Sequence, residues 1–295
     1  MSGARCGKLA RSRQEGWGLR ARRRAAHAAI YTILVAVTAI MLFPVAWMLT
    51  VSVRPNVEVM KIPPQWIPTV FTLAPYAKVL GSTRYLRTFL NSYVIALVVT
   101  AFSLVIGALA AYALARFRFK GQRAVIMFLI ITQMFPLVLL CIPYFRLVVQ
   151  LGLYDTLTAL IVVYTTFTLP FCILMLRSYF AQIPKDMEEA AMVDGCSRLG
   201  AIARTLLPMS FPALVGAGLY TFLLAWNEFL FAVVLIESWG KRVITIAIYS
   251  LLAEFVTEWS MMMAFSVLAS APLVIVFIFL QRYVVQGMTA GAIKS

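Results

Sequence analysis

The sequence predicts an all-α integral membrane protein with six transmembrane helices and both termini in the cytoplasm. Of its 295 residues, 62% are hydrophobic and only 13% are charged, and the mean hydropathy is +0.90. Soluble domains average roughly half apolar and a quarter charged residues, so this composition excludes an ordinary soluble fold. Six apolar stretches support the prediction, because about 20 apolar residues in a helix cross the ~30 Å hydrocarbon core.

The net charge of +15 is distributed as membrane topology requires. Positive residues hold a segment in the cytoplasm, and the predicted cytoplasmic segments carry 18 basic residues against 8 in the outward segments. Residues 1–27 are therefore interpreted as a basic cytoplasmic N-terminal tail. We expect no nucleic acid as a partner, and a weak contact of the tail with nucleic acid or anionic lipid stays the minor alternative. The basic residues of the tail are Arg5, Lys8, Arg11, Arg13, Arg20, Arg22, Arg23 and Arg24.

The first half of the chain contains three predicted spans. Residues 28–53 are too long for the apolar region of a secretory signal, so they are interpreted as an uncleaved anchor. Residues 54–88 contain five prolines and scattered charges, which predict an irregular external loop. The second span covers residues 89–115 and ends at a short basic turn around Gly121. The third span, residues 124–148, returns to the outer side.

The second half contains three more spans and one long charged segment. The fourth span, residues 156–180, is followed by residues 181–209, the only long mixed-charge stretch between spans, which the topology places in the cytoplasm. The fifth span covers residues 211–236, and the sixth covers residues 262–284. The whole six-helix transmembrane domain is then residues 28–290, and residues 291–295 form a C-terminal tail.

The cytoplasmic segment predicts two short helices joined by a glycine turn. Asp186 stands three residues before Glu189, the spacing of a capping box, in which each side chain accepts a hydrogen bond from a backbone donor at a helix start. Residues 188–193 favour a helix, and Gly195 is suited to end it in the left-handed conformation. A second amphipathic helix, residues 199–206, is expected to stop before the next proline. Spacing alone is equally compatible with a solvated re-entry loop.

The motif within this segment resembles the EAA loop of ABC importer permeases. Glu189-Ala190-Ala191 is followed, after three intervening residues, by Gly195 and, after nine more residues, by Thr205-Leu206-Leu207-Pro208, with Thr205 where the family usually has isoleucine. The resemblance implies coupling helices that dock on an ATP-binding subunit. The coupling residues it implies are Asp186, Glu188, Glu189, Ala190, Ala191, Asp194, Gly195, Leu207 and Pro208.

Two further segments are similar to the maltose-type carbohydrate permeases: Trp226-Asn227-Glu228-Phe229-Leu230 and residues 281–294. This resemblance implies the fold of a type I ABC importer and a multi-pass protein of the bacterial cytoplasmic (inner) membrane. The implied partners are a second homologous permease, two ATP-binding subunits, an extracytoplasmic solute-binding protein, a sugar-type solute and membrane lipid. ATP and magnesium are then bound by the partner ATPases, and this chain has no cofactor.

The candidate translocation path consists of polar residues inside predicted spans. A carboxylate such as Glu228 costs roughly 2.5 to 3.5 kcal/mol in a span, so it must face a cavity, a polar partner or the outer interface. Together with Trp226, Asn227 and Gln133 it is a candidate to bind a solute, because amides and carboxylates bind hydroxyls and an indole stacks on a sugar face. A hydrogen-bonding role toward the neighbouring permease is the alternative, and it carries more weight.

No catalytic motif is found in the sequence. Gly240-Lys241-Arg242 lacks the leading glycine and the hydroxyl residue of a phosphate-binding loop, so the chain is not expected to hydrolyse ATP. The four cysteines and the single histidine, His27, do not form a metal spacing. Two alternatives stay open: a secondary transporter driven by an ion gradient, which needs ionisable residues at the midplane of several spans, and a multispan membrane transferase.

Overall fold

The computed structural model describes residues 3–63, 65–252 and 258–289, and within these residues it contains helices and turns but no strand. The all-α fold class is confirmed. The predicted C-terminal tail, 291–295, lies outside the described residues.

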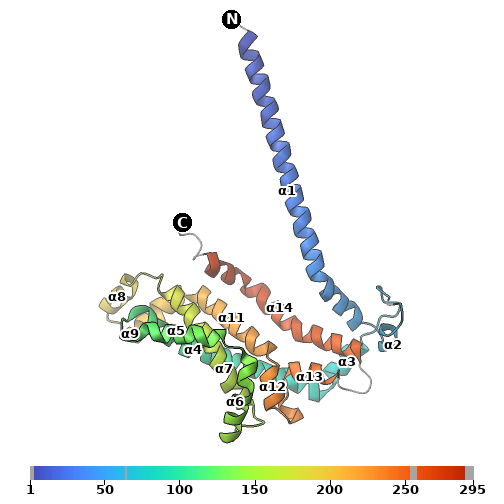
Figure 1. Ribbon diagram of the computed structural model, residues 1–295, viewed down its shortest axis with the longest axis vertical. Helices are drawn as coiled ribbons and strands as arrows, with labels where there is room; N and C mark the ends of the chain where they lie inside the picture. Colours follow the sequence, from blue (N-terminus) through green and yellow to red (C-terminus); the bar gives the residue numbers. More distant parts are fainter. Residues whose placement is uncertain (1–2, 64, 253–257, 290–295) are drawn as a thin grey trace.

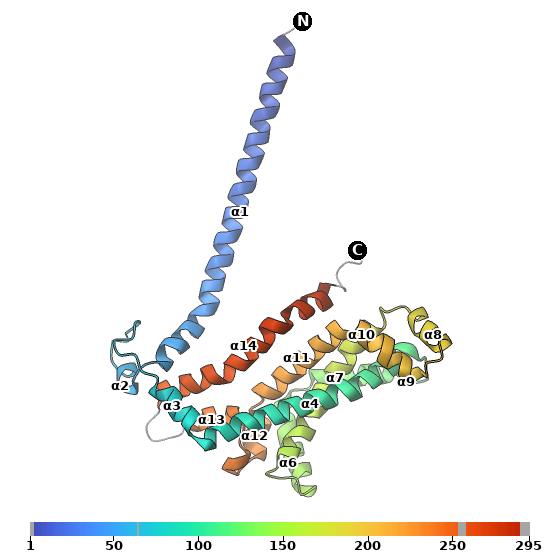
Figure 2. The same ribbon diagram turned by 180° about the vertical axis from the view of Figure 1, so that it is seen from behind.

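One helix projects from a bundle of four. The projecting helix is α1 (Gly3–Ser52), and the bundle consists of α4 (Thr83–Arg116), α7 (Leu157–Phe180), α11 (Phe211–Asn227) and α14 (Trp259–Thr289), with α11 in contact with the other three (Figures 1 and 2). Helix α1 continues without a break from the predicted first span into the basic tail and touches the bundle through α14.

The remaining elements are short and connect or cap these helices. They are α2 (Asn56–Val59), α3 (Ala74–Gly81), α5 (Gln122–Met134), α6 (Leu137–Gln150), α8 (Asp186–Val193), α9 (Arg198–Ala201), the π-helical turn η1 (Ile202–Leu206), α10 (Leu207–Met209), α12 (Leu230–Leu235), the 3-10 turn η2 (Trp239–Lys241) and α13 (Ile244–Ser250).

By length and composition, four described helices can cross a membrane: His27–Ser52, Thr83–Arg116, Leu157–Phe180 and Trp259–Arg282. Two helix pairs meet the same criteria only together. The pair α5 and α6 is bent by 101°, and the pair formed by residues 198–209 and α11 is bent by 80°. The predicted number of six spans therefore requires that each bent pair crosses the membrane as one broken span.

The predicted third span, residues 124–148, contains prolines that interrupt it, and in the structure the helix breaks at Phe135 and Pro136. Phe135 is extended, with φ −79° and ψ 128°. Proline has no backbone N–H and disfavours helical geometry in the residue before it, so α5 ends at this point and α6 leaves in a new direction.

The prediction of an irregular loop over residues 54–88 is also wrong in part. Helices α2 and α3 lie inside it, and α4 begins at Thr83, six residues before the predicted start of the second span. Arg84 and Arg87 lie in the first two turns of α4, and their charge lowers the local hydropathy without interrupting the helix.

The buried side chains form two separate cores. The larger core lies where α4, α7, α12, α13 and α14 meet and contains Tyr164, Phe231 and Phe265. The smaller core joins the ends of α4 and α7 to η1 and the start of α11. Its members are Ala108, Ala111, Tyr112, Cys172, Leu176, Phe180, Ile183, Ile202, Leu206, Ala213 and Ala217.

Candidate functional site

The segment predicted to couple the chain to an ATPase lies at one end of the bundle, where α8 and α9 protrude beyond α4 and α7 (Figures 1 and 2). Gly195 follows α8 with φ 91°, a left-handed conformation that favours glycine. Ser197 then caps α9, because its Oγ accepts a hydrogen bond from the Gly200 N–H at 3.2 Å. The two helices with a glycine turn expected from the sequence are therefore present.

Helix α8 is held against the bundle by a buried ion pair. The Nε of Arg116, the last residue of α4, donates to Oε1 of Glu188 at 2.7 Å. The two side chains are only 7% and 6% exposed. Nearby, the guanidinium of Arg198 lies 5.0 Å from the centre of the Phe117 ring. Sequence reasoning placed Glu188 in the loop but missed Arg116, because the two residues are 72 positions apart.

The other predicted coupling residues lie on the outer side of this segment. Asp186, Glu189, Ala190, Asp194, Gly195 and Pro208 are exposed, and Ala191 and Leu207 are partly buried. Three apolar side chains of the same segment, Met187, Val193 and Leu199, are also exposed. Such an apolar surface at a loop end is typical of a site that contacts another protein.

Two details of this segment differ from the prediction. The capping box is wrong: Asp186 is already the first helical residue, Lys185 precedes it in helical geometry, and no side chain caps the start of α8. The second helix does not stop before Pro208. A π-helical turn comes first, in which the Leu207 N–H bonds to Ile202 O, so Pro208 falls in the first turn of α10, where its missing N–H is tolerated.

The inner side of the segment belongs to the smaller core. Ile202 and Leu206 of η1 are buried and pack with Leu176 and Phe180 of α7. Movement of this segment must therefore displace the ends of the bundle helices, because packed interiors transmit strain.

The candidate translocation path is centred on a helix break rather than a continuous span. Helix α11 ends at Asn227, and Glu228 is extended, with ψ 132°. Its carboxylate accepts hydrogen bonds from the N–H groups of Phe231 at 2.9 Å and Ala232 at 3.1 Å, and its carbonyl accepts from Thr245 Oγ1 at 2.8 Å. Glu228 thus satisfies the free donors at the start of α12, and the predicted fifth span, residues 211–236, contains a helix break at this residue.

The other path candidates occupy different environments. Trp226 is 4% exposed and packs on Tyr93 and Phe222, with ring centres 4.7 and 5.6 Å away. Asn227 is exposed, and its amide donates to Leu223 O at 2.8 Å. In this conformation Trp226 has no free face for a solute, whereas Asn227 has.

Gln133 lines a pocket of about 240 Å³ at the bend between α5 and α6. Its amide donates to Phe167 O at 3.2 Å, and the Phe167 ring stacks on Phe231, 6.0 Å away. Tyr144 and Thr166, which are hydrogen-bonded to each other at 2.7 Å, line the same pocket. Phe167 therefore links the surroundings of Gln133 to the α12 start that Glu228 caps.

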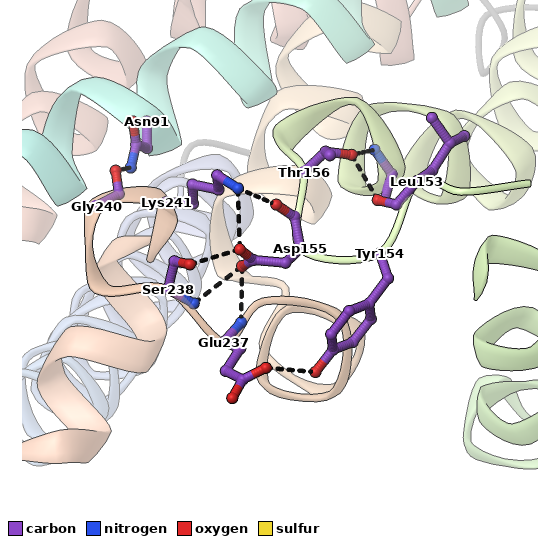
Figure 3. A network of polar contacts seen from close by, with 10 residues as sticks. Asn91, Leu153, Tyr154, Asp155, Thr156, Glu237, Ser238, Gly240 and Lys241 are labelled. Atoms are coloured by element: carbon purple, nitrogen blue, oxygen red, sulfur yellow. Dashed lines mark hydrogen bonds and ion pairs between the residues drawn. The ribbon is translucent and has the colours of Figure 1, made fainter.

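At the opposite end of the bundle, a polar clamp joins the turn before α7 to η2 (Figure 3). Asp155 Oδ1 accepts from the N–H groups of Glu237 and Ser238 at 3.0 and 2.9 Å, and Oδ2 accepts from Lys241 Nζ at 2.9 Å. Burial acts to raise the pKa of Asp155, but the bonds from Ser238, Lys241 and Glu237 outweigh it and hold the pKa well below its usual range. Asn91 fastens η2 from the other side by donating to Gly240 O. The sequence marked Asp155 only as a loop residue.

The comparisons with known proteins agree with this arrangement. Residues 103–290 match the family described as the binding-protein-dependent transport system inner membrane component. The sulfoquinovosyl glycerol transport system permease protein of Agrobacterium fabrum is 39% identical over 255 residues, which cover 86% of this chain and 89% of that protein. The trehalose/maltose transport system permease protein of Thermococcus litoralis is 38% identical over 270 residues, which cover 90% and 95%.

A solved structure has the same fold. One chain of a bacterial ABC transporter involved in the import of the acidic polysaccharide alginate matches with a TM-score of 0.75 and 22% identity, covering 88% of this chain and 97% of that one.

Proposed function

Because this chain belongs to the family of binding-protein-dependent transport system inner membrane components, we propose that it forms one half of the solute pathway of an ABC importer for a sugar or oligosaccharide. It is a multi-pass permease subunit of the inner membrane, and ATP hydrolysis belongs to separate partner subunits. Its transmembrane domain is residues 28–290, behind the cytoplasmic tail 1–27. The gradient-driven and transferase alternatives do not explain this family membership.

The observation that carries the proposed mechanism is the construction of the segment 186–208. Its outer side presents exposed apolar and acidic residues, while its inner side is joined to α4 by the Arg116–Glu188 pair and to α7 by Ile202 and Leu206. Two ATP-binding subunits, one on this chain and one on a second homologous permease, close when ATP binds. The segment then moves, and the pathway alternates between inward and outward access.

A sugar is proposed as the solute for two reasons. The relatives named above are transport permeases for sulfoquinovosyl glycerol and for trehalose and maltose. Asn227 and Gln133 are exposed on this chain. Their side-chain amides can donate hydrogen bonds to hydroxyl groups and accept hydrogen bonds from them. An extracytoplasmic binding protein delivers the solute to the outer end of the bundle.

The test is solute-stimulated ATP hydrolysis by the assembled transporter in proteoliposomes. Gly195→Ala forces a side chain into the left-handed turn of the coupling segment, and Gly121→Ala is the matched control, because Gly121 has the same φ of 91° and likewise open space around it. We expect Gly195→Ala to lose the response to the loaded binding protein and Gly121→Ala to keep it. A normal response in Gly195→Ala, with normal sugar uptake, contradicts the proposal.

A further inference from the structure

The outer segment between α1 and α3 displays apolar side chains that the described residues of the chain leave largely exposed. Its apolar side chains point outward, and the most exposed, Ile62, is 94% exposed. A group of exposed apolar side chains this large usually marks a contact with another protein or with a membrane. We call it the outer-loop patch, and its members are Val57, Met60, Ile62, Trp66, Ile67, Val70 and Phe71.

Two buried charged residues hold the backbone of this segment in shape. The guanidinium of Arg54, 2% exposed, donates to the carbonyls of Gln65 at 2.5 Å and Trp66 at 2.6 Å. The carboxylate of Glu58, 4% exposed, accepts from the Thr69 N–H at 2.7 Å and Oγ1 at 2.9 Å. Because the charges point inward and satisfy backbone groups, the apolar side chains are left facing outward. The hydrogen bonds of Arg54 and Glu58 therefore fix the backbone that carries the patch.

The patch also lies at a definite depth relative to α1. The Trp66 ring contacts Trp47 and Phe43 of α1, with ring centres 5.1 and 5.8 Å away. At 1.5 Å per residue, Trp47 and Phe43 lie roughly 7.5 and 13.5 Å below Ser52, the end of that helix. The chain therefore folds back from the end of the first span toward the membrane, to the level at which tryptophan anchors are enriched.

We propose that the outer-loop patch is seated in the outer-leaflet interface of the bilayer and that its partner is phospholipid. The patch lies beside the apolar surface of α1, whose residues 27–46 are exposed, and meets it where Trp66 contacts Phe43 and Trp47. Lys61, exposed between Met60 and Ile62, has the charge that suits phosphate headgroups beside such a surface. A folded apolar loop at this depth anchors the outer end of α1, which packs on the bundle through α14.

The experiment uses the full transporter with a single cysteine, Ile62→Cys or Ile67→Cys, in a background where Cys6, Cys141, Cys172 and Cys196 are serine and uptake is retained. An environment-sensitive fluorophore on the cysteine is compared in vesicles of ordinary and brominated phosphatidylcholine. We expect blue-shifted emission and about twofold quenching by the brominated lipid at both positions. Lys120→Cys, exposed in the turn between α4 and α5 and outside the coupling segment, is the water-facing control and is expected to stay unquenched.

Two outcomes overturn the proposal. Emission at Ile62→Cys and Ile67→Cys that matches the Lys120→Cys control means that the patch faces water or a binding protein. Quenching in the isolated subunit that disappears in the assembled transporter means that the second permease covers the patch. Neither outcome affects the coupling mechanism, which the ATPase assay tests separately.

Discussion

The side chains of Arg116 and Glu188 form a buried ion pair between the end of α4 and the first turn of α8, with Nε and Oε1 2.7 Å apart. This contact is a polar connection between the proposed ATPase-docking segment and a membrane-crossing helix. It joins two residues that are almost fully withdrawn from water.

Replacing Glu188 with glutamine is expected to destabilise the subunit and to reduce coupling. Removing one partner of a buried ion pair leaves an uncompensated charge, with a loss of about 3–5 kcal/mol. The measurement is thermal unfolding of the purified subunit, together with ATPase stimulation by the loaded binding protein.

The Lys78–Glu258 pair provides a matched control for this experiment. Its N–O distance is 2.8 Å, but its side chains are 56% and 36% exposed, and such pairs contribute about 0–1 kcal/mol. Lys78→Gln should therefore leave unfolding nearly unchanged. Equal losses in Glu188→Gln and Lys78→Gln would show that burial of the Arg116–Glu188 pair is irrelevant.

Asp155→Asn is expected to weaken the clamp between the α7 turn and η2 in a pH-dependent manner. Because folding lowers the pKa of Asp155, its charged form adds stability above the unfolded-state pKa of about 3.9, and this contribution disappears as the pH falls through the lower folded value. The difference in melting temperature between wild type and Asp155→Asn should be constant above about pH 5 and shrink below about pH 4. If the difference in melting temperature grows on acidification, the pH dependence has the opposite sign and rules out this account.

Substitutions of Trp226 and Asn227 are expected to distinguish a packing role from a role in solute binding. Trp226 is buried against two rings, so Trp226→Ala is expected to destabilise the fold by about 3–5 kcal/mol. Asn227 is exposed, so Asn227→Ala should change stability by less than about 0.5 kcal/mol and raise the KM for sugar uptake. If Asn227→Ala leaves KM unchanged in proteoliposomes, Asn227 does not contact the solute.

The Glu228 side chain is expected to stabilise the protein by capping the start of α12. Glu228→Gln keeps an acceptor for the N–H groups at the start of α12, whereas Glu228→Ala removes it and should cost about 1 kcal/mol. Unfolding of both variants in detergent is the direct comparison. Equal stability of Glu228→Ala and wild type would mean that the carboxylate does not hold the helix break.

The sequence alone determined the features that depend on local composition. The apolar stretches, the basic tail and the left-handed glycine after α8 follow from hydropathy, charge placement and backbone preferences within a few residues. The coupling motif is equally local, because its residues share one short segment of chain. For this reason the all-α membrane fold and the two short helices around the glycine turn were predictable.

Only the tertiary structure decided the partners of the buried charges and the breaks in the helices. Arg116 meets Glu188 across 72 positions, and Asp155 meets Lys241 across 86. Arg54 turns inward to bind backbone carbonyls, although in the sequence it resembles a solvated loop charge. An ionic side chain becomes buried only when distant segments supply partners that replace its hydration, and that information lies in the packing of the helices rather than in any short stretch of residues.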